Sequence, residues 1–117
     1  MIPAHEILEA AADKIAEPGR FTQRFTARKP SESPQIPGDF SCLATDPKAT
    51  SWGGLGAIFA VGRAAGLRNA DCYSIERIAC QHIGAERLMP WATDKSQADV
   101  VSALRMAAQA ERGRAVA

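Results

Sequence analysis

The chain has 117 residues, of which 46% are apolar and 23% are charged, and its formal net charge is +1. This size and composition are typical of one globular domain with an ordinary core, so residues 1–117 are expected to form a single domain. The small net charge argues against nucleic-acid binding driven by an overall basic field, and no apolar run reaches the roughly 18 residues that a membrane span needs.

The first 45 residues predict a helix followed by a β-hairpin. Apolar residues at helical spacing predict an amphipathic helix over residues 4–16, which Pro18-Gly19 ends. From Arg20 to Lys29 apolar and polar residues alternate instead, which predicts a strand over 20–28 with one basic face. A second alternating run, 39–45, is expected to pair with it across a proline-rich loop.

The most apolar stretch, Thr50 to Gly66, predicts the central helix of the fold. Thr50 or Ser51 is the expected N-cap, and Gly66 is the expected C-terminal stop. Glycines inside a helix cost roughly 1 kcal/mol each relative to alanine. We therefore expect neighbouring elements, or a ligand near the backbone, to pack closely against its four internal glycines. These are Gly53, Gly54, Gly56 and Gly62.

The C-terminal half predicts two more helices. Asn69 or Asp71 is expected to cap a helix that runs to about Glu86, and residues 89–94 are expected to form an ordered turn. Ser96 and Asp99 form a capping-box pattern that opens a helix over 97–112, with 113–117 as a frayed tail. The predicted fold is therefore α+β and mostly α: four helices, packed around the central glycine-rich helix that is one of them, and one β-hairpin.

Two features of the glycine run and the basic strand suggest anion binding, and each has a structural alternative. Gly53-Gly54-Leu55-Gly56 at a helix start resembles a phosphate cradle, but Phe59 replaces the third glycine of the dinucleotide fingerprint, and no Gly-Lys-Ser/Thr follows. Close helix packing is the favoured interpretation. The basic residues of the predicted strand are favoured as a solvated face over an anion contact. They are Arg20, Arg24, Arg28 and Lys29.

Cysteine and histidine positions give little support for catalysis or metal binding. Cys80 and His82 are two residues apart and so do not share a helix face, and no further metal-ligand spacing is present. Cys42 would need a base such as His82 nearby to act as a nucleophile. The odd number of cysteines, with no secretory signal pattern at the N-terminus, favours the cytoplasm. No cofactor and no metal are expected.

The two tryptophans, Trp52 and Trp91, both precede or follow predicted helices. Their favoured role is to anchor these junctions in the core. The alternative is a shared aromatic wall at which a planar or apolar group docks.

Five short motifs are spread along the chain in order: Pro18-Gly19, Phe21-Thr22-Gln23, Ala27-Arg28, Leu55-Gly56-Ala57-Ile58, and Trp91 with Asp94. Together they resemble a family of short bacterial and phage proteins known only as a domain of unknown function. The resemblance covers nearly the whole chain. It implies an accessory role in the conflict between phage and host, and it supplies no established activity.

The chain departs from this family pattern at two places. Relatives often carry Cys where this chain has Gly53, and they often read Trp-Asn-Asp where this chain has Trp91-Ala92-Thr93-Asp94. The missing cysteine argues against any enzymatic activity that the resemblance suggests.

Three functional hypotheses follow. The leading one is a non-catalytic binding protein of phage type that engages a host or defence protein. The second is a protein that binds a small, nucleotide-like anion, and the third is a small hydrolase that uses Cys42 or Asp94. The residues of the second hypothesis are Thr22, Gln23, Arg24, Arg28, Trp52, Gly53, Gly54, Trp91 and Asp94.

Overall fold

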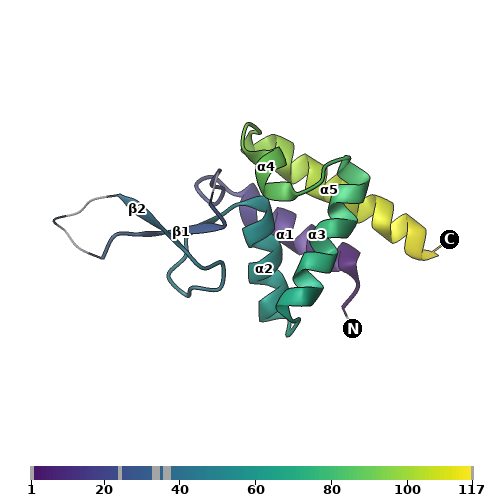
Figure 1. The fold of residues 1–117 in the computed structure, drawn as a ribbon, viewed down its shortest axis with the longest axis horizontal. Helices are drawn as coiled ribbons and strands as arrows, with labels where there is room; N and C mark the ends of the chain where they lie inside the picture. Colours follow the sequence, from purple (N-terminus) through teal and green to yellow (C-terminus); the bar gives the residue numbers. More distant parts are fainter. Residues whose placement is uncertain (1, 24, 33–34, 36–37, 117) are drawn as a thin grey trace.

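The computed structural model describes residues 2–23, 25–32, 35 and 38–116, and these form a mostly helical fold with a small sheet (Figure 1). The predicted α+β class with a helical majority is confirmed. The elements are α1 (Ala4–Ala16), β1 (Ala27–Pro30), β2 (Asp39–Cys42), β3 (Ser51–Trp52), α2 (Gly54–Ala64), α3 (Asn69–Ile83), α4 (Leu88–Ala92) and α5 (Gln97–Val116). The described residues thus contain one helix, α4, and one strand, β3, that the sequence did not predict.

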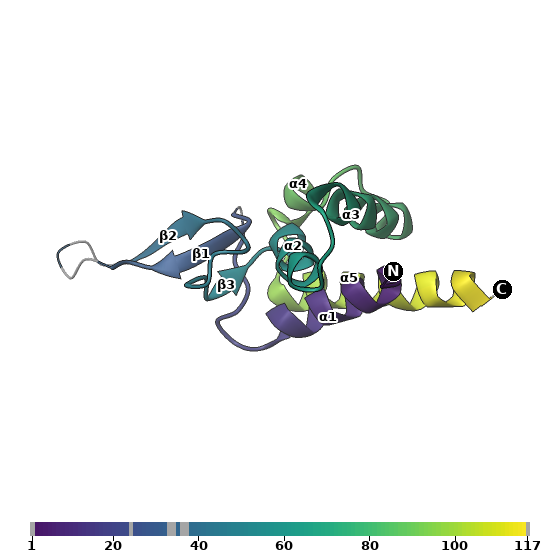
Figure 2. The ribbon, with the colours of Figure 1, turned by 90° about the horizontal axis from the view of Figure 1, so that it is seen from below.

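Helices α1 and α5 lie side by side and run in opposite directions (Figure 2). At the junction the Gln97 amide donates to the carbonyl oxygens of Ile15 and Glu17, both at 2.7 Å. Farther along, Arg105 donates to the carboxylates of Glu9 and Asp13, both at 3.0 Å. The polar side of α1 is therefore partly used to hold α5, because these charged pairs flank the apolar contact between the two helices.

The bounds of α1 are as predicted, whereas α5 is longer than predicted. Ser96 and Asp99 form the expected capping box, since each side chain accepts a hydrogen bond from the other residue's main-chain N–H. The helix continues through Gly113 to Val116, so the predicted end at 112 is wrong. A single glycine costs only about 1 kcal/mol in a helix, and it does not stop α5 here.

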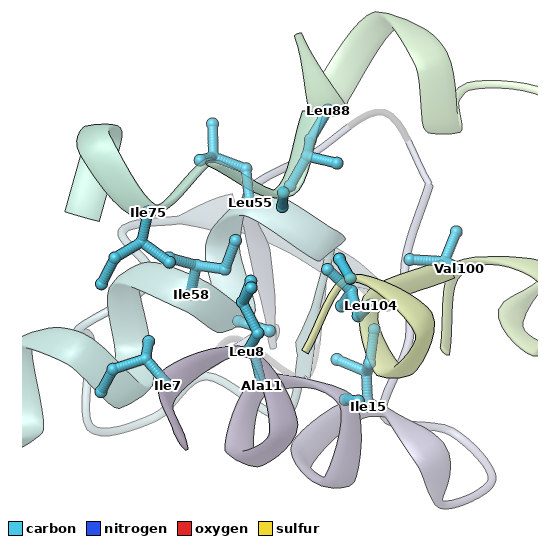
Figure 3. Close-up of a cluster of buried hydrophobic side chains, with 14 of the residues drawn as sticks. Ile7, Leu8, Ala11, Ile15, Leu55, Ile58, Ile75, Leu88, Val100 and Leu104 are labelled. Atoms are coloured by element: carbon cyan, nitrogen blue, oxygen red, sulfur yellow. The ribbon is translucent and has the colours of Figure 1, made fainter. Parts of the chain in front are cut away.

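Helix α2 is central, as predicted, because it contacts every other helix and β3. Leu55 and Ile58 point from α2 into the main core, where Leu8 of α1 and Leu104 of α5 meet them (Figure 3). All four side chains are at most 7% exposed. The core therefore lies on both sides of α2 and is shared by the helices around it.

The glycines of α2 are packed by protein, which confirms the predicted close packing. A Cβ on Gly56 would lie 1.7 Å from the carbonyl oxygen of Thr26, and one on Gly62 would lie 2.7 Å from Cys72 Sγ. Both distances are shorter than a van der Waals contact allows. Glycine is thus required at Gly56, where the main chain just before β1 approaches the helix, and at Gly62 an added Cβ would have to displace the Cys72 side chain of α3.

The start of α2 differs from the prediction. Gly53 is the N-cap residue, and neither Thr50 nor Ser51 takes that position. No side-chain hydrogen bond caps the start of the helix. Ser51 and Trp52 form β3 instead, with Trp52 N–H donating to the Arg20 carbonyl oxygen at 2.8 Å. Pairing with residues distant in sequence has overridden the local capping signal. The predicted end is confirmed, because Gly66 follows the helix with φ +91°.

The sheet has the order β2-β1-β3 and is antiparallel, with Ala27 opposite both Cys42 and Trp52. The predicted hairpin is confirmed, but its first strand begins at Ala27 and not at Arg20. Phe21 makes only an isolated parallel bridge to Trp52, and a tight turn with Phe25 N–H donating to the Gln23 carbonyl oxygen interrupts the strand. Part of the predicted loop between the strands, 33–34 and 36–37, lies outside the described residues.

Helix α3 starts and ends earlier than predicted. Arg68 is its N-cap residue, while Asp71 acts from the first turn by accepting a hydrogen bond from Arg68 N–H at 2.9 Å. Gly84, with φ +86°, ends the helix before Glu86. Glycine adopts this left-handed conformation at little cost, and so it stops α3.

The predicted turn at 89–94 is a short helix, α4, which a buried carboxylate fixes in place. Glu76 of α3 has a side chain only 4% exposed, and it accepts hydrogen bonds from Leu88 N–H at 3.0 Å and from Arg87 Nε at 3.3 Å. The hydrogen bond with Glu76 raises the pKa of Arg87 above its usual value. Glu76 thus satisfies a free N–H in the first turn of α4.

The molecule is elongated, with principal extents of 56 × 30 × 23 Å. The β1–β2 hairpin projects from one end of the helical body, and the C-terminal part of α5 extends at the other (Figures 1 and 2). This arrangement leaves the hairpin with few neighbours, and it sets the geometry of the candidate sites.

Candidate functional site

The residues of the anion-binding hypothesis lie in three separate places. Gln23, Trp91 and Asp94 gather around Lys95: the Gln23 amide donates to the Lys95 carbonyl oxygen, Lys95 Nζ lies 5.3 Å from the centre of the Trp91 ring, and it pairs with Asp94 at 3.0 Å. Trp52 lines a different cavity, and no residue is shared between that cavity and the hollow beside Trp91. The two tryptophans therefore do not form one aromatic wall.

The predicted glycine cradle is occupied by the chain itself. A Cβ on Gly53 would lie 2.6 Å from the Phe25 carbonyl oxygen, and one on Gly54 would lie 3.3 Å from Val100 Cγ1. Both glycines are buried, and Gly53 N–H donates to the Thr26 carbonyl oxygen at 3.0 Å. These contacts leave little room for a phosphate at this helix start.

Thr22 and Arg28 also have structural partners, and Arg24 lies outside the described residues. Thr22 N–H donates to the Trp52 carbonyl oxygen at 3.0 Å, and the Arg28 guanidinium packs 5.1 Å from the Phe25 ring centre. Arg28 Nη2 donates to the Asp39 carbonyl oxygen at 2.9 Å. Arg28 Nε is buried with no hydrogen-bond partner among the described residues.

Trp52 forms one wall of a cavity of about 570 Å³ between α1, α2 and residues 44–49. Its side chain is well buried, and its Nε1–H donates to the Ala44 carbonyl oxygen at 3.1 Å. Lys14 Nζ lies 4.0 Å from the ring centre, a cation–π contact. Arg63 and Thr45 also line this cavity.

The acidic residue of this cavity, Asp46, is already neutralised. Its carboxylate accepts a hydrogen bond from Lys48 N–H at 2.9 Å and lies 3.3 Å from Lys29 Nζ. The hydrogen bond from Lys48 N–H, with a smaller contribution from Lys29, lowers the pKa of Asp46 below its usual value. Lys14 and Arg63 pair with no carboxylate in the part of the chain that the structure describes. The cavity is therefore basic.

A second cavity of about 350 Å³ lies on the α3 side of the segment that follows β2. Phe59 and Tyr73 meet edge to face on its wall, with ring centres 4.9 Å apart. Leu43, which is 75% exposed, stands at its rim, and Leu55 also lines it. The lining of this cavity is mixed: Leu55, Phe59 and Tyr73 give it an apolar side on which an apolar side chain can pack, and polar residues complete it. The polar residues are Thr26, Thr45, Arg63 and Asn69.

Strand β2 forms an open edge of the sheet. The Arg28 carbonyl oxygen accepts a hydrogen bond from Thr50 N–H at 2.9 Å, so the main-chain groups of Arg28 point toward the β3 side of the sheet. The residue opposite Arg28 on β2 is Ser41. Main-chain groups of successive strand residues point to alternate sides. Ser41 and Asp39 therefore direct their N–H and C=O groups away from β1, toward solvent.

The cysteines and histidines do not assemble a reactive centre among the described residues. Burial raises the pKa of the Cys72 and Cys80 thiols, and burial together with Asp46 raises that of Cys42. A raised pKa keeps a thiol protonated and less nucleophilic at neutral pH. His82, the base considered for Cys42, instead pairs with Glu111 on α5 at 2.9 Å.

Metal-ligating side chains in the described ranges form no group of three or more. Within the same ranges, no helix combines the length and the apolar character that a membrane crossing requires. Neither finding identifies a function.

The sequence analysis did not select Lys14, Thr45, Arg63, Phe40 or Leu43, which line the cavities or the hairpin surface. Lys14 and Arg63 stand in the last turns of two amphipathic helices, where basic residues are common for reasons of helix stability. Leu43 lies within the alternating run 39–45, which predicts a strand and gives this residue no functional role. In the sequence Leu43 is only an apolar residue near the end of a predicted strand, and such a position indicates no binding role until the tertiary structure shows the cavity beside it.

Comparisons of this chain with protein-family models, with curated proteins and with solved structures find no match. The resemblance to short bacterial and phage proteins therefore stays a prediction, and the function has to be argued from the site itself.

Proposed function

We propose that this protein is a non-catalytic binding module that holds an extended segment of a protein partner along the open edge of β2. The observation that carries the proposal is the projecting hairpin, whose outer strand is paired on one side only within the described residues. Unpaired strand edges are ready templates for another strand, and proteins use them to recognise extended peptides.

The main-chain groups available for such pairing are few but well placed. Ser41 offers an N–H and a C=O on the open side, and Asp39 offers an N–H. The Asp39 carbonyl oxygen is taken by Arg28 Nη2. A short added strand is therefore the expected mode of binding, with affinity supplemented by side chains.

Apolar side chains on and next to β2 supply that supplement. Phe40 is 45% exposed and Leu43 is 75% exposed, so both side chains are accessible to a bound segment. The cavity whose apolar side is formed by Phe59 and Tyr73 opens beside Leu43. One apolar side chain of the bound segment enters this cavity, while main-chain hydrogen bonds fix its register.

Under this proposal the partner belongs to the class that the family resemblance implies, a host or defence protein met by a phage accessory protein. Partner identity follows from the peptide sequence that β2 prefers. A hydrolase function using Cys42 or Asp94 has less support, because the Cys42 thiol is held in its protonated form and Asp94 pairs with Lys95 on the surface.

The test is selection of peptides from a displayed random library on the purified protein, followed by affinity measurement for the enriched peptides. Ser41→Pro removes only an N–H that faces solvent, and proline is tolerated at such edge positions. We expect Ser41→Pro to weaken peptide binding by more than about tenfold, because one well-aligned main-chain hydrogen bond to the peptide is lost. Ser41→Thr, which keeps the N–H and suits a strand, is the matched control and should bind as the wild type does.

Leu43→Glu is the second variant, because it alters a side chain and leaves the strand backbone unchanged. It should weaken the same peptides, with the melting temperature unchanged, since Leu43 is mostly exposed. The proposal is wrong if no peptide is enriched, or if the enriched peptides bind both Ser41→Pro and Leu43→Glu as tightly as the wild type.

A further inference from the structure

The basic cavity beside Trp52 is separate from the open edge of β2, and no carboxylate among the described residues pairs with its two cations, Lys14 and Arg63. We infer that this cavity, between the ends of α1 and α2 and residues 44–49, binds the phosphate group of a small molecule through Lys14, Arg63 and Thr45. The inference does not depend on peptide binding at β2.

Lys14 stands apart from the other lysines of the chain. Lys29, Lys48 and Lys95 each pair with a carboxylate, at 3.3, 2.6 and 3.0 Å respectively. Lys14 pairs with none among the described residues and lies instead 4.0 Å from the Trp52 ring centre. Its ammonium group keeps hydrogen-bond donors that a ring face does not fully satisfy.

Arg63 supplies the second positive charge on the same cavity. One of its nitrogens, Nη1, donates to the Leu67 carbonyl oxygen at 3.0 Å, which leaves other donors of the guanidinium available. A role in helix stability accounts for a basic residue in the last turn of α1 and of α2. It does not account for both residues facing one cavity whose single acid, Asp46, is held by Lys29 and the Lys48 N–H.

The donor set favours phosphate over a carboxylate. Lys14, Arg63 and the Thr45 hydroxyl are an ammonium, a guanidinium and a hydroxyl, and Thr45 has no hydrogen-bond partner among the described residues. A phosphate monoester carries close to two negative charges at neutral pH and three strong acceptor oxygens. It therefore matches the two cations and the number of donors, which a singly charged carboxylate does not.

The size of the cavity and the burial of Trp52 restrict the rest of the ligand. At about 570 Å³ the cavity has room for more than a free phosphate ion. The Trp52 ring is 7% exposed and is covered by Lys14, so it does not offer a free face for stacking. Recognition consequently rests on the phosphate group, with little discrimination of an attached base or sugar.

The experiment titrates the protein with inorganic phosphate, adenosine monophosphate, adenosine and chloride at constant ionic strength. Readouts are the melting temperature and the fluorescence of Trp52 in a Trp91→Phe background. Inorganic phosphate and adenosine monophosphate should raise the melting temperature and change the fluorescence, because a ligand bound to the native state stabilises it. Adenosine and chloride should do neither.

Variants assign the effect to the cavity. Lys14→Gln and Arg63→Gln should each raise the Kd for phosphate roughly tenfold, the usual loss for one charge-assisted hydrogen bond, and Lys14→Arg should restore binding. Lys95→Gln is the matched control, since Lys95 also lies over a tryptophan ring but outside the cavity, and it should bind phosphate as the wild type does. If Arg63→Gln is unstable because the hydrogen bond from Arg63 to the Leu67 carbonyl oxygen is lost, the test rests on the two Lys14 variants.

Three results overturn the inference: no stabilisation by inorganic phosphate at about 50 mM, far above ordinary ligand affinities; an equal effect of chloride; or an unchanged Kd in Lys14→Gln. Peptide binding at β2 should persist in Lys14→Gln, since Lys14 belongs to α1, so the two proposals fail separately.

Discussion

Single atoms decide the most specific positions of this chain, and Gly56 is the clearest of them. The Thr26 carbonyl oxygen sits where a Cβ on Gly56 would stand, and the same oxygen accepts a hydrogen bond from Gly53 N–H. The backbone at Thr26, just before β1, is thus held against the first turn of α2 at a distance that excludes any side chain. Cys72 imposes the same requirement at Gly62, through its sulfur atom.

Gly56→Ala should destabilise the protein by about 3 kcal/mol or more, because β1 has to move away from α2 and the Gly53–Thr26 hydrogen bond is strained. Urea unfolding followed by circular dichroism measures the change. Gly113→Ala is the control: Gly113 lies in α5 with open space around it, so alanine should be neutral or add up to about 1 kcal/mol. Equal effects at the two positions would contradict this account.

Elements are placed in this fold by polar contacts as well as by the core, and α4 shows how. It has only five residues, too few for a helix to be stable by itself. Leu88 anchors it in the core, and the Glu76 carboxylate holds its first N–H and Arg87. A buried carboxylate is tolerated here because it is both paired and hydrogen-bonded.

Glu76→Gln should lower the free energy of unfolding by about 1–3 kcal/mol, since an amide loses the charge and makes a weaker bond to Arg87 and Leu88 N–H. The measurement is chemical denaturation, with the Trp91 fluorescence as a local reporter of α4. Glu86→Gln changes an exposed neighbour in the same way and should be within about 0.5 kcal/mol of the wild type. A Glu76→Gln protein as stable as Glu86→Gln would show that the core alone places α4.

At the scale of the whole molecule, the helical body and the projecting hairpin differ in how they are stabilised. The body shares one core across α1, α2, α3 and α5, in which residues such as Leu8 and Leu104 are almost fully buried. The hairpin is stabilised mainly by its own strand pairing, by the hydrogen bond from Arg28 Nη2 to the Asp39 carbonyl oxygen, and by the ion pair between Lys29 and Asp46. Regions with little buried apolar surface open locally at lower free energy than the core does.

Native-state hydrogen exchange should therefore give low protection for the Phe40 and Cys42 amides and protection near the global value for Leu8 and Ile58. Leu104→Ala, which opens a cavity in the body, should lower the protection of the core amides by about 2–5 kcal/mol. The hairpin amides should keep their exchange rates in that variant, because they exchange by local opening. Parallel losses in both regions would mean that the hairpin and the body unfold together.

Local patterns in the sequence were sufficient for much of the fold. The apolar stripe of α1, the capping box of α5 and the stop at Gly66 depend on residues within one or two turns, so they were predicted correctly. The β3 strand and the short α4 were not, because each depends on a partner distant in sequence: Trp52 pairs with Ala27, and Leu88 N–H reaches Glu76. The end of α3 was also predicted too late, although its signal, Gly84, is local.

The sequence by itself determined the fold class and the demand for close packing around the glycines of α2, because helical periodicity and glycine's backbone cost are local properties. Only the tertiary structure decided what fills the space beside those glycines, which is the main chain just before β1 and side chains of α3 and α5, and not a ligand. It also separated Trp52 from Trp91 and brought Lys14 to Arg63, since the side chains that share a cavity are set by how helices pack, and helix packing is not readable from spacing along the chain.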